Sequence, residues 1–348
     1  MMTASVLTTE LAIVLEQRPV PLPSADEVLI KVSSVGICAS DVHYFREGRI
    51  ANFVVDSPIV LGHEAAGTIV AVGSAVAVSR ISQRVSIEPQ RPQLHSAQTL
   101  AGHYNLDPQM AFYATPPVDG AFAEYVIIQS HFAHLVPDSL SDDAASLLEP
   151  LSVAVAAARK AALTVGDRVL LSGAGPIGLV LVQVAKAYGA AEIVVTDLDA
   201  GRLNLAEKLG ATSVYDPRAV DLSAEPNFDV FFDASGAAAA VQAGIRSLAP
   251  LGRAVLIGMG ADEYPLPVST IQNRELTVTG VFRYANTWPT AISLVERGLV
   301  NLDILVSGHF GLESVREALE TSSAASVLKN MVLPGLPVAQ APSSSTAV

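Results

Sequence analysis

The sequence contains a single cysteine, Cys38, among its 348 residues. One cysteine excludes an internal disulfide, and so sparse a use of cysteine fits a reducing compartment. The chain also lacks an apolar run long enough to span a bilayer, and its first residues lack the charged and apolar regions of a signal peptide. We therefore expect a cytoplasmic protein without a membrane partner, whose thiolate chemistry can only take place at Cys38.

Positive charge is also scarce. The chain has 21 Lys and Arg residues against 34 Asp and Glu residues, which gives a formal net charge of -13, and it has no long basic run. This balance argues against a nucleic-acid backbone or an anionic membrane surface as the partner. Half of the residues are hydrophobic, and the length suggests about two domains with a core each. We expect a small-molecule partner.

The pattern of apolar residues changes along the chain. Short apolar stretches bounded by Gly and Pro, such as residues 28–32 and 65–72, are typical of a β-rich domain. From residue 165 to 290 strands and helices alternate, which predicts an α/β fold with a parallel sheet. Ser141 has the chemistry of a helix cap, and we expect Glu149-Pro150 to interrupt the helical region that follows. We place a domain boundary near residue 150.

A glycine-rich loop lies between a predicted strand and a predicted helix. It runs Gly173-Ala174-Gly175-Pro176-Ile177-Gly178, and Asp197 ends the strand that follows the helix. This context is typical of a doubly wound sheet that binds a dinucleotide with its pyrophosphate at the helix N-terminus. The carboxylate of Asp197 can accept both ribose hydroxyls and would repel a 2′-phosphate. We predict NAD rather than NADP, although Arg202 lies nearby and could reach a phosphate.

Three residues near the N-terminus offer the donor types of a catalytic zinc site. Cys38, His63 and Glu64 supply a thiolate, an imidazole and a carboxylate, and Glu149 is a further candidate because an unpaired carboxylate among apolar neighbours is costly. Spacing alone does not decide, because Cys38 and His63 can meet only through the fold. Cys38 could instead be a small core residue, His63 a hydrogen-bonded core imidazole and Glu64 a surface acid.

Several segments occur in the order of a known family. Residues 36–43 (GICASDVH) and 62–67 (GHEAAG), with the Gly173 loop, resemble the zinc-dependent medium-chain alcohol dehydrogenase superfamily. Residues 104–106, 112–120, 148–152 and 282–288 resemble its polyol branch of sorbitol, xylitol and arabinitol dehydrogenases. The resemblance implies a GroES-like catalytic domain of residues 1–150 and 290–348, a Rossmann NAD-binding domain of residues 151–289, and a homotetramer.

The resemblance also implies a metal site and a reaction. One zinc per subunit would be held by Cys38, His63 and Glu64 with a water, Glu149 would hold that water or bind the metal in another state, and Asp41 would fix the imidazole of His63. A hydride would pass from a secondary hydroxyl of a sugar alcohol to NAD⁺, giving the ketose, and the reverse.

The same resemblance assigns roles to further residues. Ser40 and His43 stand where the superfamily places a proton relay, although in the polyol branch the proton can instead leave through the zinc-bound water and Glu149. Ser40 is then better supported as a substrate contact than His43 as the terminal base. The implied substrate contacts are Tyr44, Phe112, Thr115, Glu149, Arg283 and Tyr284, of which Tyr44 and Phe112 could also be ordinary core residues. The implied cofactor contacts are Gly173, Gly175, Pro176, Ile177, Gly178, Asp197, Arg202, Val281 and Arg283.

The chain departs from the family at the second, structural zinc. Most members bind that metal with four cysteines, and the aligned positions here carry Gln93, Ser96, Thr99 and Asp107. These side chains bind zinc far too weakly to replace thiolates, although they could form a hydrogen-bonded substitute. We predict that packing or a neighbouring subunit holds this polar segment, and that His95 and His103 within it are surface residues rather than metal ligands.

Two other functions stay open at this point. The chain could act on another secondary alcohol, such as a diol or a hydroxy amino acid, or it could be a non-catalytic relative that binds a nucleotide.

Overall fold

The structure is a computed structural model that describes residues 1–222 and 227–336. The chain divides into two compact units. The first unit comprises Met1–Arg91, Ala111–Val136 and Val306–Val348, and the second comprises Pro92–Met110 and Pro137–Leu305. Residues 337–348, which the sequence assigns to the catalytic domain, lie outside the described residues.

The first unit is rich in strands. Its strands are β1 (Met2–Leu7), β2 (Ile13–Arg18), β3 (Glu27–Gly36), β4 (Arg49–Ile50), β5 (Phe53–Val54), β6 (Ile59–Val60), β7 (Glu64–Val72), β8 (Arg84–Ile87), β9 (Gln90–Arg91), β10 (Ala111–Phe112), β11 (Tyr125–Gln129), β12 (Ala133–Leu135), β19 (Val306–Phe310) and β20 (Lys329–Val332). Its helices are α1 (Ala39–Glu47), α10 (Val315–Thr321) and the short 3₁₀ turns η1 (Val78–Arg80), η3 (Ser130–Phe132) and η5 (Leu312–Ser314).

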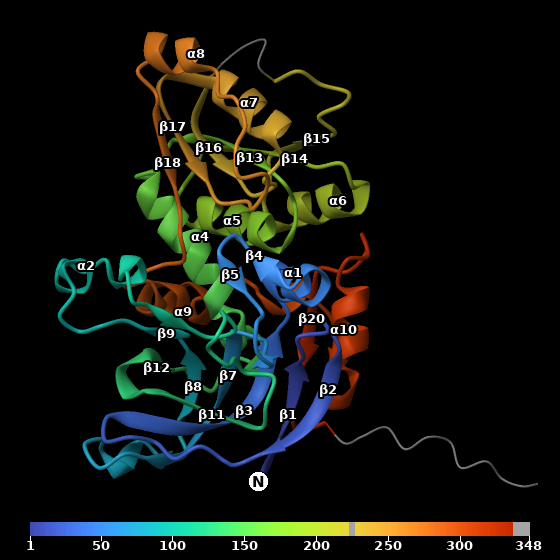
Figure 1. Cartoon of the computed structure of the whole chain (residues 1–348). Helices are drawn as coiled ribbons and strands as arrows, with labels where there is room; N and C mark the ends of the chain where they lie inside the picture. The colour runs from blue at the N-terminus through green and yellow to red at the C-terminus, as the bar shows by residue number, and fades with distance from the viewer. Residues whose placement is uncertain (223–226, 337–348) are drawn as a thin grey trace, which may run out of the picture. The chain divides into compact units, whose positions relative to one another are not determined.

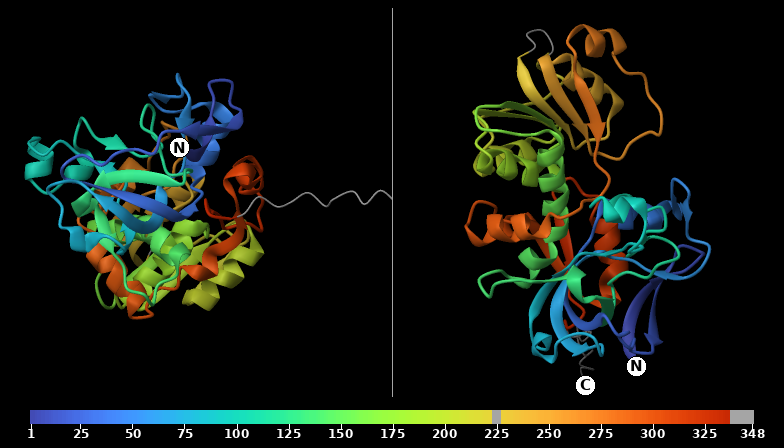
Figure 2. Two further views of the ribbon diagram at one scale, coloured as in Figure 1. Left: turned by 90° about the horizontal axis from the view of Figure 1, so that it is seen from below. Right: turned by 90° about the vertical axis from the view of Figure 1, so that its left-hand side faces the viewer.

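A seven-stranded sheet forms the centre of the first unit. Its strands follow the order β12-β8-β7-β3-β20-β19, and β11 also pairs with β3. Near the end of β3, Gly36 pairs with Glu64 of β7 on one side and with Met331 of β20 on the other. Figures 1 and 2 show the C-terminal strands, in red, among the blue strands of the N-terminal region. This register places Glu64 and Met331 on either side of Gly36, two residues before Cys38.

The N-terminal strand β1 is an element that the sequence analysis does not predict. It pairs with β2 and β6 in a three-stranded sheet, and all of its residues except Thr3 are buried. Its composition, MTASVL, contains small and polar residues at buried positions, so the apolar pattern that marks a strand is weak there.

The second unit holds a parallel sheet covered by helices. Its strands are β13 (Arg168–Ser172), β14 (Glu192–Thr196), β15 (Ser213–Tyr215), β16 (Phe228–Asp233), β17 (Leu248–Leu256) and β18 (Thr277–Gly280). Its helices are α2 (Ala97–Leu100), η2 (Tyr104–Leu106), α3 (Asp142–Ser146), α4 (Leu148–Lys160), α5 (Pro176–Ala187), α6 (Ala200–Leu209), α7 (Ala238–Arg246), α8 (Val268–Asn273), α9 (Trp288–Glu296) and η4 (Asp303–Leu305).

The strand order of this sheet is that of a Rossmann fold. The strands follow the order β15-β14-β13-β16-β17-β18, and every pairing is parallel. The first strand of the unit, β13, lies at the centre, with β14 and β15 added on one side of it and β16 to β18 on the other. Helices α5 and α6 contact the sheet at β13, β14 and β15, whereas α7 contacts β13, β16 and β17. Figure 1 shows the sheet between these two groups of helices. The α/β fold predicted from the sequence is confirmed.

Two details near residue 150 differ from the sequence analysis. Helix α4 begins at Leu148, so the predicted interruption at Glu149-Pro150 is wrong: Pro150 lies in the first turn, where its missing N–H removes no helical hydrogen bond. The predicted cap is confirmed, because Ser141 Oγ accepts a hydrogen bond from the backbone N–H of Ala144 at 2.9 Å.

The compact units also divide at other positions than the predicted domains. Helix α4 packs against α5 and α9 and belongs with the second unit, which begins at Pro137 and ends at Leu305. These limits differ from the predicted boundary near residue 150, which was drawn from a change in composition, and from the one near residue 290, which the family resemblance implied.

Among the described residues, the structure has no helix that is both long and apolar enough to cross a membrane.

Candidate metal centre and cofactor loop

Cys38 lies directly before helix α1 and occupies its N-cap position. The backbone N–H of Cys38 donates a hydrogen bond to Oδ2 of Asp41, in the first turn of the helix, at 2.9 Å. This contact satisfies a backbone group that the helix itself leaves unpaired, and it fixes the turn that carries the thiol.

His63 and Glu64 lie at the start of strand β7. The backbone N–H of Gly62 donates a hydrogen bond to Oδ1 of Asp41 at 3.0 Å, and Gly62 has a φ of +87°, which favours glycine. The buried carboxylate of Asp41 therefore binds both the Cys38 turn and the loop that delivers His63. The same Oδ1 lies 3.7 Å from Nδ1 of His63, within ion-pair distance but too long for a hydrogen bond.

The fold brings the three predicted zinc donors together. Ligand atoms of Cys38, His63 and Glu64 all lie within 4.8 Å of one another, and His63 and Glu64 are buried. Among the described residues these three form the only such cluster of His, Cys, Asp and Glu. His95 and His103 are exposed and do not take part in it, in agreement with their prediction as surface residues.

The surroundings of His63 favour its charged form when no metal is bound. Burial by itself lowers the pKa of His63, but the charges of Asp41 and Cys38 outweigh burial, and the pKa lies well above its ordinary value. A carboxylate beside Nδ1 also favours the proton on that nitrogen, which leaves Nε2 to donate a lone pair to a metal.

One oxygen of Glu64 shows that the cluster fits a cation. Oε1 accepts a hydrogen bond from Nζ of Lys329 at 2.7 Å, whereas Oε2 is buried and has no hydrogen-bond partner within the described parts of the chain. A buried carboxylate oxygen without a partner is costly. A thiolate, an imidazole and this oxygen are donors that zinc prefers, so the residues present fit the metal.

The remaining predicted residues of this unit lie on α1, in β10 and in the turn that follows β10. Tyr44 is buried, whereas Ser40 and His43 are partly exposed, and Nε2 of His43 pairs with Oε2 of Glu47 at 3.2 Å. The buried ring of Phe112 lies 5.6 Å from the imidazole of His63.

Thr115 belongs to a turn close to Phe112 in sequence. Its backbone N–H donates to the carbonyl of Phe112, and its own carbonyl accepts from Val118 at 2.8 Å. Its backbone thus holds the turn, and the residue is partly exposed.

The glycine loop in the second unit has the geometry of a dinucleotide-binding turn. Gly173 has a φ of +93°, and a Cβ on Gly178 would lie 1.8 Å from the carbonyl oxygen of Gly173, so neither position accepts another residue without strain. A Cβ on Gly175 would meet nothing within 4 Å. Gly175 caps helix α5 and Pro176 begins it, so the open space lies at a helix N-terminus that suits a phosphate.

Asp197, directly after strand β14, is tied to this loop. Its Oδ2 accepts a hydrogen bond from the backbone N–H of Ala174 at 2.6 Å, and its Oδ1 accepts from the N–H of Asp199 at 2.9 Å. Arg202 lies in the first turn of α6, where its backbone N–H donates to Oδ1 of Asp199. The carboxylate thus stands at the edge of the sheet where doubly wound folds hold the ribose.

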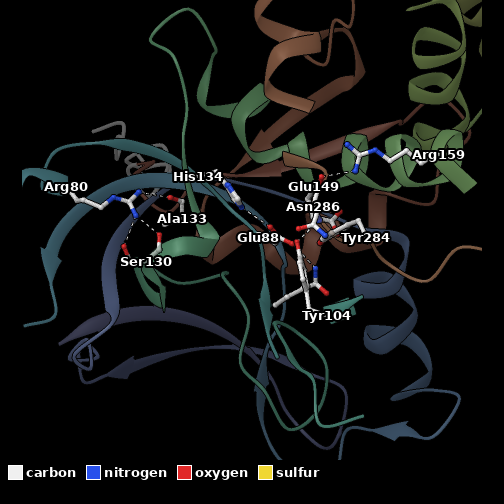
Figure 3. A network of polar contacts seen from close by, with 11 residues as sticks. Arg80, Glu88, Tyr104, Ser130, Ala133, His134, Glu149, Arg159, Tyr284 and Asn286 are labelled. Carbon is white, nitrogen blue, oxygen red and sulfur yellow. Dashed lines mark hydrogen bonds and ion pairs between the residues drawn. The ribbon is translucent and has the colours of Figure 1, made fainter. Parts of the chain in front are cut away.

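A loop after strand β18 carries three further predicted residues, Val281, Arg283 and Tyr284. Arg283 has a φ of +56°, which is unusual for a residue with a side chain, and its guanidinium lies over the ring of Phe282. Tyr284 is buried and donates a hydrogen bond from its hydroxyl to Oε1 of Glu149 at 2.6 Å (Figure 3). Val281 donates its backbone N–H to the carbonyl of Leu256. As predicted, Arg283 and Tyr284 follow the end of a strand.

We define the lobe as Pro92–Met110, the segment without the four structural cysteines. Within the lobe, the backbone N–H groups of Gln93 and Gln109 both donate to the buried carboxylate of Asp107. Ser96 caps the short helix α2 by accepting from the N–H of Thr99, and the two hydroxyls lie 2.9 Å apart. The four residues aligned with the missing cysteines therefore form hydrogen-bonded groups, as the sequence analysis allowed.

The lobe is also hydrogen-bonded to the loop after β18, in the same unit. Asn105 donates to the carbonyl of Phe282, and Asn286 donates its backbone N–H to the hydroxyl of Tyr104 at 2.7 Å (Figure 3). Asn286 also donates through its side chain to the carbonyl of Gly102, and its own carbonyl accepts from Arg159 at 2.8 Å. Hydrogen bonds within the subunit thus hold the lobe, and the predicted contribution of packing or of a neighbouring subunit stays a prediction.

Lys329 is the residue of this site that the sequence analysis missed. No motif marks it, since it lies 265 positions from Glu64 in the chain. A lysine within the buried final strand is the only signal that the sequence offers, because lysine is rarely buried without a partner.

Comparisons with known proteins match two parts of the chain to two family models. Residues 24–138 match the alcohol dehydrogenase GroES-like domain and residues 176–297 match the zinc-binding dehydrogenase family. Sorbitol dehydrogenase of Bos taurus is 43% identical over 329 residues, which cover 91% of this chain and 92% of that protein. Sorbitol dehydrogenase of Bacillus subtilis is 42% identical over 327 residues, with 92% and 93% covered.

A solved structure shares the whole fold. It is that of 2R,3R-butanediol dehydrogenase from Bacillus subtilis, which superposes with a TM-score of 0.87 at 31% identity and covers 96% of this chain and 100% of that one. The chain belongs to the zinc-dependent medium-chain alcohol dehydrogenase family, and within it to the polyol dehydrogenase branch. The predicted family is confirmed, and the chain is a zinc-dependent dehydrogenase.

Proposed function

We propose that the protein is an NAD-linked zinc dehydrogenase that oxidises a secondary hydroxyl of a five- or six-carbon sugar alcohol to the ketose, and catalyses the reverse reaction. The observation that carries the proposal is the cluster of Cys38, His63 and Glu64 with ligand atoms within 4.8 Å of one another. The relatives named sorbitol dehydrogenase support the substrate class.

Cys38, His63 and Glu64 hold one zinc per subunit in this proposal. When bound, zinc acts as a Lewis acid that lowers the pKa of a substrate hydroxyl. Asp41 orients the imidazole of His63 and the Cys38 turn through the contacts described above. The role of Glu149 toward the metal or its water stays a prediction, and its observed partner is the hydroxyl of Tyr284.

The proton released from the substrate needs a path to solvent. One route leads through the hydroxyl of Ser40 to His43, whose ring is partly exposed and lies 3.2 Å from the carboxylate of Glu47, and the other leads through Glu149. Ser40 is better supported as a substrate contact than His43 as the terminal base. The resemblance to the polyol dehydrogenases supports the assignment of substrate binding to Tyr44, Phe112, Thr115, Arg283 and Tyr284.

NAD is the preferred cofactor in this proposal. Asp197 places a carboxylate next to the loop of Gly173, Gly175 and Gly178, and a negative charge there opposes the 2′-phosphate of NADP. We assign Pro176, Ile177, Arg202, Val281 and Arg283 to the same cofactor site. A cytoplasmic location and a homotetramer stay predictions.

A second candidate is a dehydrogenase of another secondary alcohol. The similarity to the structure of a butanediol dehydrogenase favours a diol as the alternative substrate, and a hydroxy amino acid such as threonine is a further one. A non-catalytic nucleotide-binding relative would have no reason to keep all three metal donors in one cluster.

The test combines metal analysis with a substrate panel. We expect one zinc per subunit and oxidation of xylitol, sorbitol, arabitol or galactitol with NAD⁺ at a higher kcat/KM than with NADP⁺. Faster turnover of butanediol or threonine than of every polyol would replace the substrate assignment. Two zincs per subunit would contradict the prediction that the lobe binds no metal. Absence of zinc would contradict the proposed role of Cys38, His63 and Glu64 as metal ligands.

A further inference from the structure

Lys329 is a buried cation at the edge of the metal cluster. Its side chain is 4% exposed, and that of Glu64 is 1% exposed. The ammonium donates to Oε1 of Glu64 at 2.7 Å and to the backbone carbonyl of Ile37 at 2.9 Å. Burying such a pair costs much of the attraction that it gains, so the pair is weak evidence for a purely stabilising role.

The two groups that Lys329 binds belong to the two segments that carry the metal donors. Ile37 directly precedes Cys38, and Glu64 directly follows His63. The lysine comes from a third segment, strand β20, which pairs with β3 on the side opposite to β7. The backbone N–H of Ile37 also donates to the carbonyl of Asn330 at 2.9 Å, so β20 approaches the Cys38 turn through two contacts.

The lysine makes the two oxygens of Glu64 unequal. Oε1 is engaged by the ammonium, whereas Oε2 is buried without a hydrogen-bond partner in the described chain. The available lone pairs of this carboxylate are therefore concentrated on Oε2.

The charges of the metal donors also suit a divalent cation. A thiolate at Cys38 and a carboxylate at Glu64 together balance a divalent cation, and the ammonium of Lys329 pairs with Oε1 of that same carboxylate. A carboxylate that also binds a cation through its other oxygen donates less strongly to a metal, which leaves the metal a stronger Lewis acid.

We propose that Lys329 is a positioning residue of the zinc centre, which holds Oε1 of Glu64 so that this carboxylate binds the metal through Oε2 alone. The proposal rests on the zinc ligand set of the proposed function. A catalytic zinc needs a position that the protein leaves to water or substrate, and a carboxylate bound through both oxygens would fill it. Lys329 thus protects the substrate position.

The test compares cobalt-substituted wild type with Lys329→Met, which removes the ammonium and keeps a long apolar side chain. Visible absorption of Co²⁺ is strong in four-coordinate sites and weaker in five-coordinate ones, so we expect Lys329→Met to lose visible absorbance as both oxygens of Glu64 bind. Lys329→Arg restores the cation and should restore the spectrum. Lys31→Met, the same change at an exposed position of β3, is the matched control and should leave the spectrum unchanged.

The outcomes separate the inference from the proposed function. A thiolate-to-cobalt charge-transfer band in the wild type supports Cys38 as a ligand, and its absence would remove the ligand set itself. With that band present, a Lys329→Met spectrum identical to that of the wild type at equal metal content would overturn the inference alone.

A second measurement does not depend on the variant folding. In a crystal structure of the zinc-loaded wild type, we expect Oε2 of Glu64 on the metal and Oε1 on Lys329. Binding of zinc through both oxygens of Glu64 would overturn the inference.

Discussion

The metal cluster and the lobe satisfy buried polar groups in opposite ways. In the cluster, Cys38, His63 and Glu64 converge within 4.8 Å, and one oxygen of Glu64 lacks a partner in the described chain. In the lobe, the buried carboxylate of Asp107 accepts from two backbone N–H groups. The first arrangement is complete only with a cation, whereas the second is complete in the protein alone.

The difference shows how a chain can keep one metal site and do without another. A structural metal site only has to hold a chain segment in place, and the hydrogen bonds that Asp107, Ser96 and Tyr104 accept from backbone N–H groups do this here. A catalytic site needs a Lewis acid, which no hydrogen bond replaces. Three predictions test this contrast and a fourth concerns a buried hydroxyl outside both regions, in order from the largest expected effect to the smallest.

Removing the thiolate should have the largest effect. Cys38→Ser takes away the one soft donor, and since changes around a metal ligand already cost about 10- to 100-fold in affinity or activity, we expect a loss of more than about 100-fold in kcat/KM. Zinc content, measured by atomic absorption, should fall with activity while the lobe stays folded. Full activity in this variant would exclude the metal mechanism.

Weakening the support of the cluster should have the next effect. Asp41→Asn keeps the shape but removes the charge that faces Nδ1 of His63 at 3.7 Å. We expect zinc affinity, measured by competition with a chelator, to fall about 10- to 100-fold. Glu47→Gln, on the exposed end of α1, serves as the control and should leave affinity as it is.

Removing the carboxylate of the lobe should lower stability without changing metal content. Asp107→Ala leaves two backbone N–H groups unpaired, and we expect the free energy of unfolding in urea to fall by about 1–3 kcal/mol. Gln109→Ala is the matched control, because Gln109 donates through its backbone. Loss of zinc in Asp107→Ala would show that the two regions are not independent.

The smallest effect at neutral pH should come from Tyr113, beside the strand β10 that follows the lobe. Its hydroxyl donates to the carbonyl of Ile127 at 2.6 Å, and burial raises its pKa to about 12. Tyr113→Phe should cost about 0.5–1.5 kcal/mol below pH 10 through the lost hydrogen bond.

At high pH, Tyr113→Phe should become more stable than the wild type. A raised pKa stabilises the fold fully below the unfolded value near 10, and this contribution is lost as the pH rises toward 12, by about 3 kcal/mol in all. Wild type should therefore lose stability between pH 10 and 12 relative to Tyr113→Phe. Parallel pH profiles of the two proteins would contradict this account of Tyr113.

The sequence predicted the second unit better than the first. Strand β13, the Gly173 loop, helix α5 and strand β14 follow one another directly, so local patterns of apolar residues and glycine suffice to locate them. The first unit is built from strands distant in sequence, and its β1 was missed because small and polar residues fill buried positions. The predicted interruption of the helical region at Glu149-Pro150 is wrong because a proline is tolerated in the first turn of a helix.

The sequence by itself determined which donors exist: one thiol at Cys38, a His63-Glu64 pair and no set of four cysteines for a second zinc. Only the tertiary structure decided that these donors meet, because strand register between β3, β7 and β20 places Gly36 beside Glu64 and Met331. It also brought Lys329 to Oε1 of Glu64 and left Oε2 of this carboxylate without a hydrogen-bond partner in the part of the chain that the structure describes. Residue types fix the chemistry that is available, whereas pairing between distant strands fixes which groups share a site.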